Sequence, residues 1–218
     1  MTEAGGEAQS RRAFGALIDA LRGGELPSSS FHSMQQLVSV LGFPISSIRE
    51  AVKRAEAQGL VEILPKRGIQ VMSADLDSTR NCMDMRATLD KEGARRLLAR
   101  GKGRDWSGLR AAHEALLARA QAGIGAAEAV DAIDVDLSLH DALAEELDNP
   151  LLRRCYEENR TRIAIIQNTR PFLADRVASA MEEHLAIISA IEAGDEPAVK
   201  EAIDLHFLQT LRWWGIHG

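Results

Sequence analysis

Asp136 and His140 lie one helical turn apart in the sequence, and His184 and His206 follow far downstream. Residues at positions i and i+4 share one face of a helix, so this carboxylate and the first imidazole can bind one ion together. Two later helices would supply the other imidazoles. One carboxylate with three imidazoles suits a divalent ion such as zinc, nickel or manganese better than calcium or magnesium, which prefer oxygen ligands. The spacing therefore predicts a metal site.

The apolar neighbours of these four residues decide how the pattern is interpreted. A histidine on a helix is more often an ordinary polar residue than a ligand. Here, however, the candidates share helix faces with hydrophobic residues: Met181, Ile188 and Ile191 for His184; Val199, Ala202 and Ile203 for His206; Ile133, Leu143 and Leu147 for Asp136. A buried aspartate is costly unless it is paired or coordinated, so joint metal binding is favoured. The remaining histidines, His32, His113 and His217, show no comparable pairing.

The composition predicts a globular protein. The chain has 218 residues, of which 45% are hydrophobic and 27% charged, enough for one good core or two smaller ones. No apolar run approaches the roughly 18 residues of a membrane-spanning helix, and the first residues lack the pattern of a signal peptide. We therefore expect a cytoplasmic protein without membrane contact. Cys82 and Cys155 lack CxxC spacing, so we expect reduced, buried thiols.

Charge is unevenly distributed along the chain. The net charge is −6, yet residues 9–70 contain eight Lys or Arg and only five Asp or Glu. The N-terminal third is therefore the part that could approach the phosphates of a nucleic acid.

The N-terminal third also has the pattern of a winged helix. Apolar spacing predicts helices at residues 10–22, 33–41 and 45–58, with a turn at Gly42 between the last two. Such a pair forms a helix-turn-helix, which occurs in many folds that never contact DNA. The strand-like runs 59–64 and 68–72 follow, separated by Pro65-Lys66-Arg67, and they predict a hairpin with a basic tip. The combination is more specific and predicts a winged helix-turn-helix domain at residues 9–73.

The rest of the chain has only helical patterns. Apolar residues recur at intervals of three and four, which predicts helices near residues 76–100, 105–122, 126–148, 150–169, 172–193 and 196–214. The predicted fold class is therefore mainly α, with an N-terminal winged helix-turn-helix followed by an antiparallel bundle of about six helices at residues 75–218. The four metal-ligand candidates come from the third, fifth and sixth of these helices, and metal sites are commonly built inside such bundles.

Motifs over nearly the whole chain resemble the GntR superfamily of bacterial transcription regulators, in the FadR-like branch with a metal-binding FCD effector domain. The motifs that carry this resemblance are the segments 36–52, 56–61 and 66–68 in the first domain, and 136–140, 149–152, 183–184, 190–195 and His206 in the second. Six helices rather than seven are similar to the VanR subgroup. The resemblance implies that Asp136, His140, His184 and His206 are the metal ligands.

The resemblance also implies a DNA-binding homodimer. Two winged helices would bind successive major grooves of a pseudo-palindromic operator on double-stranded DNA, and the protein would most often act as a repressor. The implied DNA-binding residues are Ser46, Ser47, Arg49, Lys53, Lys66, Arg67 and Gly68. At two positions where the family usually has arginine, this chain has Gln35 and Ile45. These departures weaken the expected base contacts and leave the operator sequence open.

The effector implied by the resemblance is a small organic acid or a related metabolite. A carboxylate could fill open positions on the metal ion. Arg86 matches a family arginine near this cavity and could bind the carboxylate, but a salt bridge with Asp90 at i+4 is an equal alternative. Arg162 is a weaker candidate of the same kind.

Two other functions remain open from the residues alone. The aspartate and histidines could form the centre of a metal-dependent enzyme. Against this, the chain lacks an HExxH motif, and Glu183 points about 100° away from its neighbour His184 on a helix. No catalytic residue is therefore predicted. The second alternative is a winged helix that mediates protein contacts without binding DNA; the retained Arg49 and the basic hairpin count against it.

Overall fold

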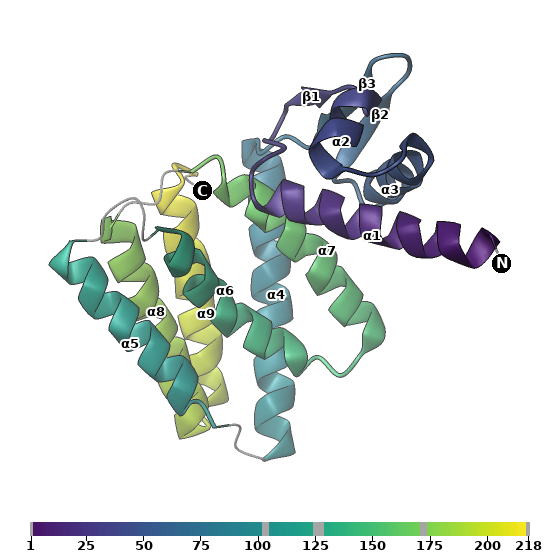
Figure 1. Ribbon diagram of the computed structural model, residues 1–218. Helices are drawn as coiled ribbons and strands as arrows, with labels where there is room; N and C mark the ends of the chain where they lie inside the picture. Colours follow the sequence, from purple (N-terminus) through teal and green to yellow (C-terminus); the bar gives the residue numbers. More distant parts are fainter. Residues whose placement is uncertain (1, 102–104, 124–128, 171–173, 217–218) are drawn as a thin grey trace. The chain divides into compact units, whose positions relative to one another are not determined.

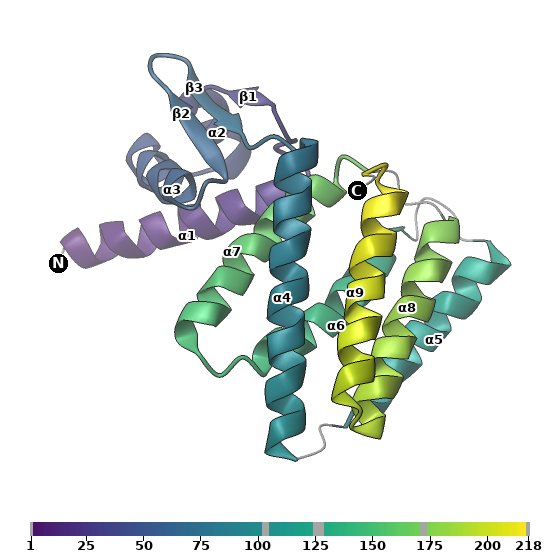
Figure 2. The same ribbon diagram turned by 180° about the vertical axis from the view of Figure 1, so that it is seen from behind.

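The computed structural model describes residues 2–101, 105–123, 129–170 and 174–216. These residues form two compact units, one comprising residues 1–79 and 158–170 and the other residues 80–157 and 171–218. Figures 1 and 2 show the elements from opposite sides. Within the described ranges, no helix is long and apolar enough to cross a membrane.

The first unit contains a winged helix. Its helices are α1 (Thr2–Arg22), α2 (Met34–Leu41) and α3 (Ile45–Ala57), and its strands are β1 (Phe31–His32), β2 (Val61–Leu64) and β3 (Gly68–Val71). The strands form an antiparallel sheet in the order β1-β3-β2. Ser33 caps α2, because its hydroxyl accepts a hydrogen bond from the Gln36 backbone at 3.2 Å while the Gln36 side chain accepts one from the Ser33 backbone. Gly42, with φ of 72°, ends α2 and sets the turn into α3.

Two features of this unit differ from the sequence-based prediction. Helix α1 begins at Thr2 rather than near residue 10, and β1 adds a short strand that the sequence did not predict. Strand β1 lies against the start of β3, where Gly68 has φ of 115° and a Cβ would overlap the His32 carbonyl oxygen. Only glycine fits this conformation and this approach, so Gly68 is required by the sheet itself.

The C-terminal part of α7 (Pro150–Gln167) belongs to this first unit. Ile165 is part of its hydrophobic core. The Arg22 guanidinium donates hydrogen bonds to the Thr161 hydroxyl at 2.9 and 3.1 Å, and the Asn168 amide donates one to the Arg22 carbonyl at 2.9 Å. The sequence-based division at residues 73–75 assigned this segment to the helical domain, because helical periodicity shows that a face is buried but not which core receives it.

The second unit is a helical bundle. It contains most of α4 (Leu76–Arg100), then α5 (Ser107–Ala122), α6 (Ala129–Glu145), the first part of α7, α8 (Ala174–Ala193) and α9 (Glu196–Trp213). In both views α8 lies between α5 and α9. The mainly α fold class is confirmed, and the ends of each helix from α4 to α9 lie within a few residues of the predicted range. Residues 126–128 and 172–173 of those ranges lie outside the described residues.

A glycine allows α4 and α6 to approach each other closely. A Cβ at Gly93 in α4 would overlap the backbone carbonyl oxygen of Leu143 in α6. The side chains around this contact include Ala94, Leu139, Ala142 and Leu143, all buried in one cluster. The close approach brings the polar residues of α4 within reach of His140 on α6.

Candidate metal centre and DNA-binding surface

Three of the four predicted ligands converge in the core of the second unit. His140 on α6, His184 on α8 and His206 on α9 have ligand atoms that all lie within 4.8 Å of one another. Their exposed fractions are 1%, 0% and 3%. Asp136, one turn before His140, is also buried, and its Oδ1 lies 3.8 Å from Nε2 of His184. The structure therefore brings together the four residues that the spacing singled out.

Each of the three imidazoles is held through its Nδ1 atom. Nδ1 of His140 donates a hydrogen bond to Oδ2 of Asp90 at 2.7 Å, and Nδ1 of His206 donates one to Oε2 of Glu183 at 2.6 Å. A carboxylate can only accept when it is ionised, so with Asp90 and Glu183 ionised these bonds place the ring proton on Nδ1. The lone pairs of both rings are then on Nε2, the atom that faces the centre. Hydrogen bonds of this kind commonly orient histidine ligands of metals.

His113 on α5 orients the third imidazole, that of His184, in the same way. Its Nδ1 donates to the carbonyl oxygen of Leu109 at 2.8 Å, and its Nε2 lies 3.2 Å from Nδ1 of His184. A carbonyl oxygen can only accept, so the ring proton of His113 is on Nδ1. Its Nε2 therefore accepts a hydrogen bond from Nδ1 of His184. The prediction that His113 has no comparable pairing was wrong. The sequence did contain a signal for this role, because His113 shares a helix face with Leu116 and Ala120, and all three are buried.

Burial keeps the imidazoles neutral. It lowers the pKa of His140 and of His184 well below the usual value, and it lowers that of His206 although Glu183 acts in the opposite direction. Neutral imidazoles are the form that binds metal. Burial also raises the pKa of Asp90 to about 7, against the nearby charge of Arg86.

One of the inward-facing nitrogens has no hydrogen-bond partner. Nε2 of His140 is buried without a hydrogen-bond partner, and an unpaired buried polar atom is costly. Nε2 of His184 lies 3.4 Å from Nε2 of His206. With both protons on Nδ1 these two atoms carry lone pairs, so they cannot hydrogen-bond to each other. Two such lone pairs beside a third, with the carboxylate of Asp136 close by, fit the ligand set of one divalent ion.

Arg86 lies at this centre, whereas Arg162 is engaged elsewhere. The guanidinium of Arg86 is 4% exposed and donates a hydrogen bond to Nε2 of His206 at 3.2 Å. Its charge also partly offsets the rise that burial causes in the pKa of Asp90. Arg162 belongs to the first unit, where its guanidinium donates to the backbone carbonyl of Gln58. The structure gives Arg162 a contact with the winged helix and none with the histidine cluster.

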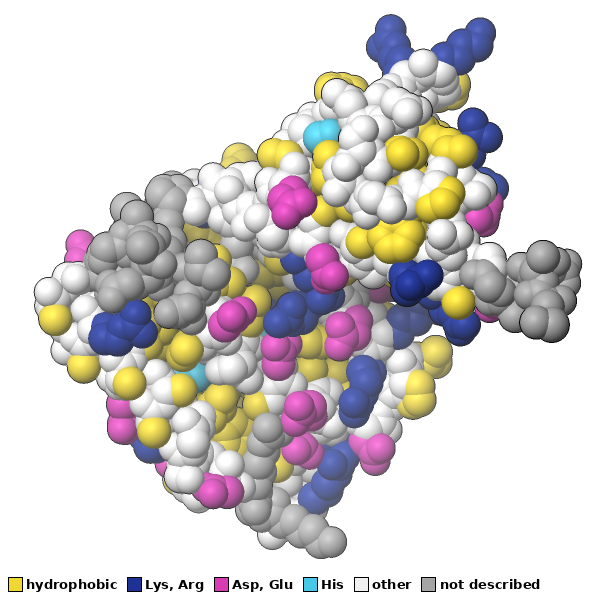
Figure 3. All heavy atoms as spheres, in the orientation of Figure 1, with side chains coloured by type: hydrophobic (Ala, Val, Ile, Leu, Met, Phe, Trp, Pro, Cys, Tyr) yellow, Lys and Arg dark blue, Asp and Glu magenta, His cyan; other side chains and the backbone are white. Residues whose placement is uncertain are grey.

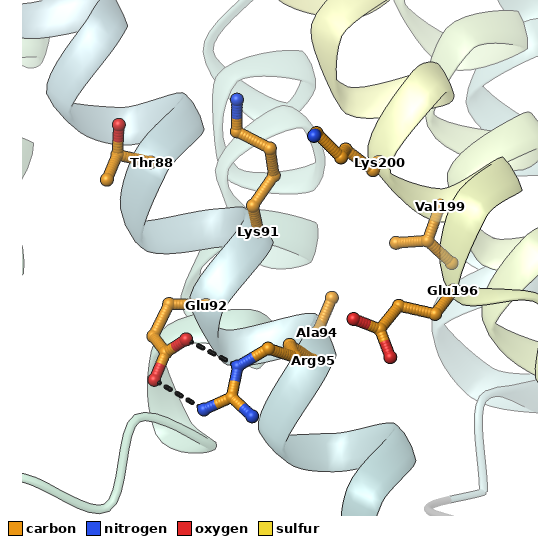
Figure 4. Close-up of a pocket in the computed structure, with 8 residues that line it drawn as sticks. All are labelled: Thr88, Lys91, Glu92, Ala94, Arg95, Glu196, Val199 and Lys200. Atoms are coloured by element: carbon orange, nitrogen blue, oxygen red, sulfur yellow. Dashed lines mark hydrogen bonds and ion pairs between the residues drawn. The ribbon is translucent and has the colours of Figure 1, made fainter.

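A separate surface groove between α4 and α9 has a volume of about 360 Å³ (Figure 4) and contains none of the four predicted ligands. Its cations are already neutralised in part. Lys91 pairs with Asp204 at 2.7 Å, and Arg95 pairs with Glu92 at 2.8 and 2.9 Å. Lys200 also lines the groove and is exposed.

The predicted DNA-binding residues divide into exposed and buried ones. Ser46, Arg49 and Lys53 on α3 are exposed, as are Lys66 and Arg67 at the turn between β2 and β3. Lys and Arg side chains project from the tip of this hairpin in Figure 3. Ser47, in contrast, is only 3% exposed and lies on the core face of α3, so it is not available to DNA. Lys53 is paired with Glu50 at 2.9 Å.

Comparisons with known proteins find a family model that matches much of the second unit and solved structures that match nearly the whole chain. A family model of the FCD domain matches residues 81–209. McbR/YncC of E. coli has a similar structure, with a TM-score of 0.76 at 16% identity over 95% of this chain and 97% of that one. A putative transcriptional regulator GntR from Rhodococcus sp. RHA1 gives 0.74 at 16% identity over 97% and 100%. Lar, described as controlling the expression of the Listeria monocytogenes agr system, gives 0.57 at 15% identity over 95% and 97%. No curated protein matches the chain.

Proposed function

Because the chain belongs to the FCD-domain family, in the FadR-like branch of the GntR transcription regulators, we propose that it is a cytoplasmic repressor that binds a pseudo-palindromic operator as a homodimer. The observation that carries the DNA-binding part is the exposed surface formed by α3 and the β2–β3 hairpin. Arg49 lies on the exposed face of α3, and Lys66 and Arg67 lie at the hairpin tip. A recognition helix beside a basic wing suits the major groove and the flanking phosphates.

The second unit would sense the effector. Asp136, His140, His184 and His206 would hold one divalent ion of the zinc, nickel or manganese class, which supplies positive charge and open positions for a small carboxylate. Arg86 is the residue that supports this choice of ligand, because its buried guanidinium already points at the cluster. A bidentate contact from Arg86 would favour a carboxylate over a neutral metabolite.

A metal-dependent enzyme is a weaker alternative. Hydrolysis at such a centre needs an acid or base free to move a proton. Asp90 and Glu183, two of the carboxylates beside the histidines, are each hydrogen-bonded to a ligand imidazole. These bonds suit the orientation of ligands. The prediction that the chain is not an enzyme agrees with its family.

The DNA-binding proposal is tested by selection from genomic DNA fragments with the purified full-length protein. One pseudo-palindromic sequence should be enriched. Its affinity should fall about 10³-fold or more between 50 and 200 mM salt if roughly six or more phosphates are contacted. A selection that enriches no sequence, with no salt-dependent binding to any duplex, would instead favour the protein-interaction module.

A single substitution tests the role of α3. Arg49→Ala should weaken operator binding by about 1–3 kcal/mol if the guanidinium contacts a base. Lys200→Ala removes an exposed cation from α9 in the other unit and serves as the control, which should bind DNA as the unmodified protein does. Equal affinities for all three proteins would show that Arg49 is an ordinary solvated charge.

A further inference from the structure

Helix α3 has one buried and one exposed face. Four of its residues are completely buried in the core of the first unit: Ile48, Ala51, Val52 and Ala55. The opposite face includes Ile45, Arg49 and Lys53, which are four residues apart and so form one stripe along the helix. Ile45 is the first residue of α3, and 40% of it is exposed. An apolar side chain therefore begins the stripe that is otherwise cationic.

We propose that Ile45 recognises a thymine in each operator half-site by contacting its C5-methyl group in the major groove. This inference rests on the proposed DNA-binding function. The N-terminal residues of a recognition helix are the ones that reach base edges. Isoleucine has no hydrogen-bond donor or acceptor, so it cannot read the polar edges of guanine, adenine or cytosine. The thymine methyl group is the apolar feature that the major groove presents.

The position of Arg49 predicts a second base in the half-site and its distance from this thymine. It lies one turn after Ile45, about 6 Å further along the helix. Successive bases of one strand are separated by about 3.4 Å along the DNA axis. Arg49 is exposed and makes no ion pair with any other residue of the described ranges, so its guanidinium is free to bind O6 and N7 of a guanine. The half-site should therefore contain a thymine and a guanine roughly two base pairs apart.

Val40 offers a matched comparison. Isolated apolar residues are common on protein surfaces, so exposure alone does not identify a base contact. Val40 is also β-branched and 48% exposed, but it lies near the end of α2 rather than at the start of α3. Removing each side chain in turn separates the effect of position from the effect of lost apolar surface.

Deoxyuridine provides the test, because it differs from thymidine only by the missing C5-methyl group. Each thymine of the selected operator is replaced in both half-sites, and the affinity of the full-length protein is measured for each duplex. At one position the replacement should weaken binding about fourfold per half-site, the amount expected for one methyl group. Ile45→Ala should bind the thymine operator more weakly and should not distinguish it from the deoxyuridine operator. Val40→Ala should distinguish them as the unmodified protein does.

The outcomes separate this inference from the function on which it rests. If no duplex is bound specifically, the proposed DNA-binding function fails and the inference fails with it. If the operator is bound but deoxyuridine has no effect at any position, DNA binding stands and the role of Ile45 is overturned. The role of Ile45 would also be overturned if Ile45→Ala still distinguished the thymine and deoxyuridine operators, or if Val40→Ala no longer did. Either result would assign the methyl contact to another residue.

Discussion

His113 is hydrogen-bonded to His184, one of the predicted ligands of the candidate metal centre. Asp90, Glu183 and His113 each accept a hydrogen bond from Nδ1 of one imidazole, and His113 does so with a ring nitrogen rather than a carboxyl oxygen. The sequence identified the four ligand candidates because each lies on an apolar helix face. It did not identify these three partners, because the bonds join residues 71, 50 and 23 positions apart, and only packing of the helices brings them together.

The effect of substituting His113 on metal affinity should therefore depend on whether the new side chain can accept a hydrogen bond from Nδ1 of His184. His113→Leu removes the acceptor for His184 Nδ1 and should weaken metal affinity by about 10- to 100-fold. His113→Gln retains an acceptor oxygen near the position of Nε2 and should recover most of the affinity. Metal titration gives the affinities, and the nitrogen NMR signals of His184 report which ring nitrogen carries the proton. Equal losses in both variants, with the His184 proton still on Nδ1, would indicate a packing role only.

Apart from the start of α1, the helices were predicted well because their apolar periodicity is strong and glycine or proline marks their ends. The prediction was poorer where tertiary contacts decide the structure. Strand β1 has only two residues and depends on pairing with β3. The C-terminal part of α7 is helical by its own sequence, but its place in the first unit depends on contacts such as that between Arg22 and Thr161. Such contacts are not encoded in local patterns.

The packing of α4 against α6 gives a prediction about glycine. Gly93→Ala forces a Cβ against the Leu143 carbonyl oxygen and should destabilise the protein by about 1–3 kcal/mol. Gly108→Ala is the matched control, because a Cβ there meets nothing within 4 Å. In a helix that change should be neutral or stabilising, by up to about 1 kcal/mol. Chemical denaturation measures both; a stability of Gly93→Ala equal to that of Gly108→Ala would contradict the close approach.

At the scale of the whole molecule, two helices connect the units. Helix α4 crosses the division after Thr79, and α7 crosses it after Glu157. The winged helix nevertheless has its own hydrophobic core, including Leu17, Ile48 and Ile69. An ion that binds only the folded second unit stabilises that unit by mass action, whereas the winged helix does not need the ion to form its core.

Removal of metal should therefore affect the two functions unequally. A chelator should lower the melting temperature and the affinity for a carboxylate effector, while operator binding is partly retained. Calorimetry and operator binding with and without chelator provide the measurements. The division of roles would be wrong if chelation abolished operator binding completely while melting remained unchanged.

The most direct test of the metal centre is the amount of divalent metal bound per chain. The protein is purified without chelator, equilibrated with zinc, freed of unbound ion and analysed for metal. About one ion per chain is expected, because the four predicted ligands converge on one centre. His184→Ala and His206→Ala should lose the ion and melt at a lower temperature, whereas His32→Ala, which changes a histidine of the winged helix, should keep it. Metal content near zero in the unmodified protein, or an unchanged content and melting temperature in His184→Ala and His206→Ala, would contradict the account.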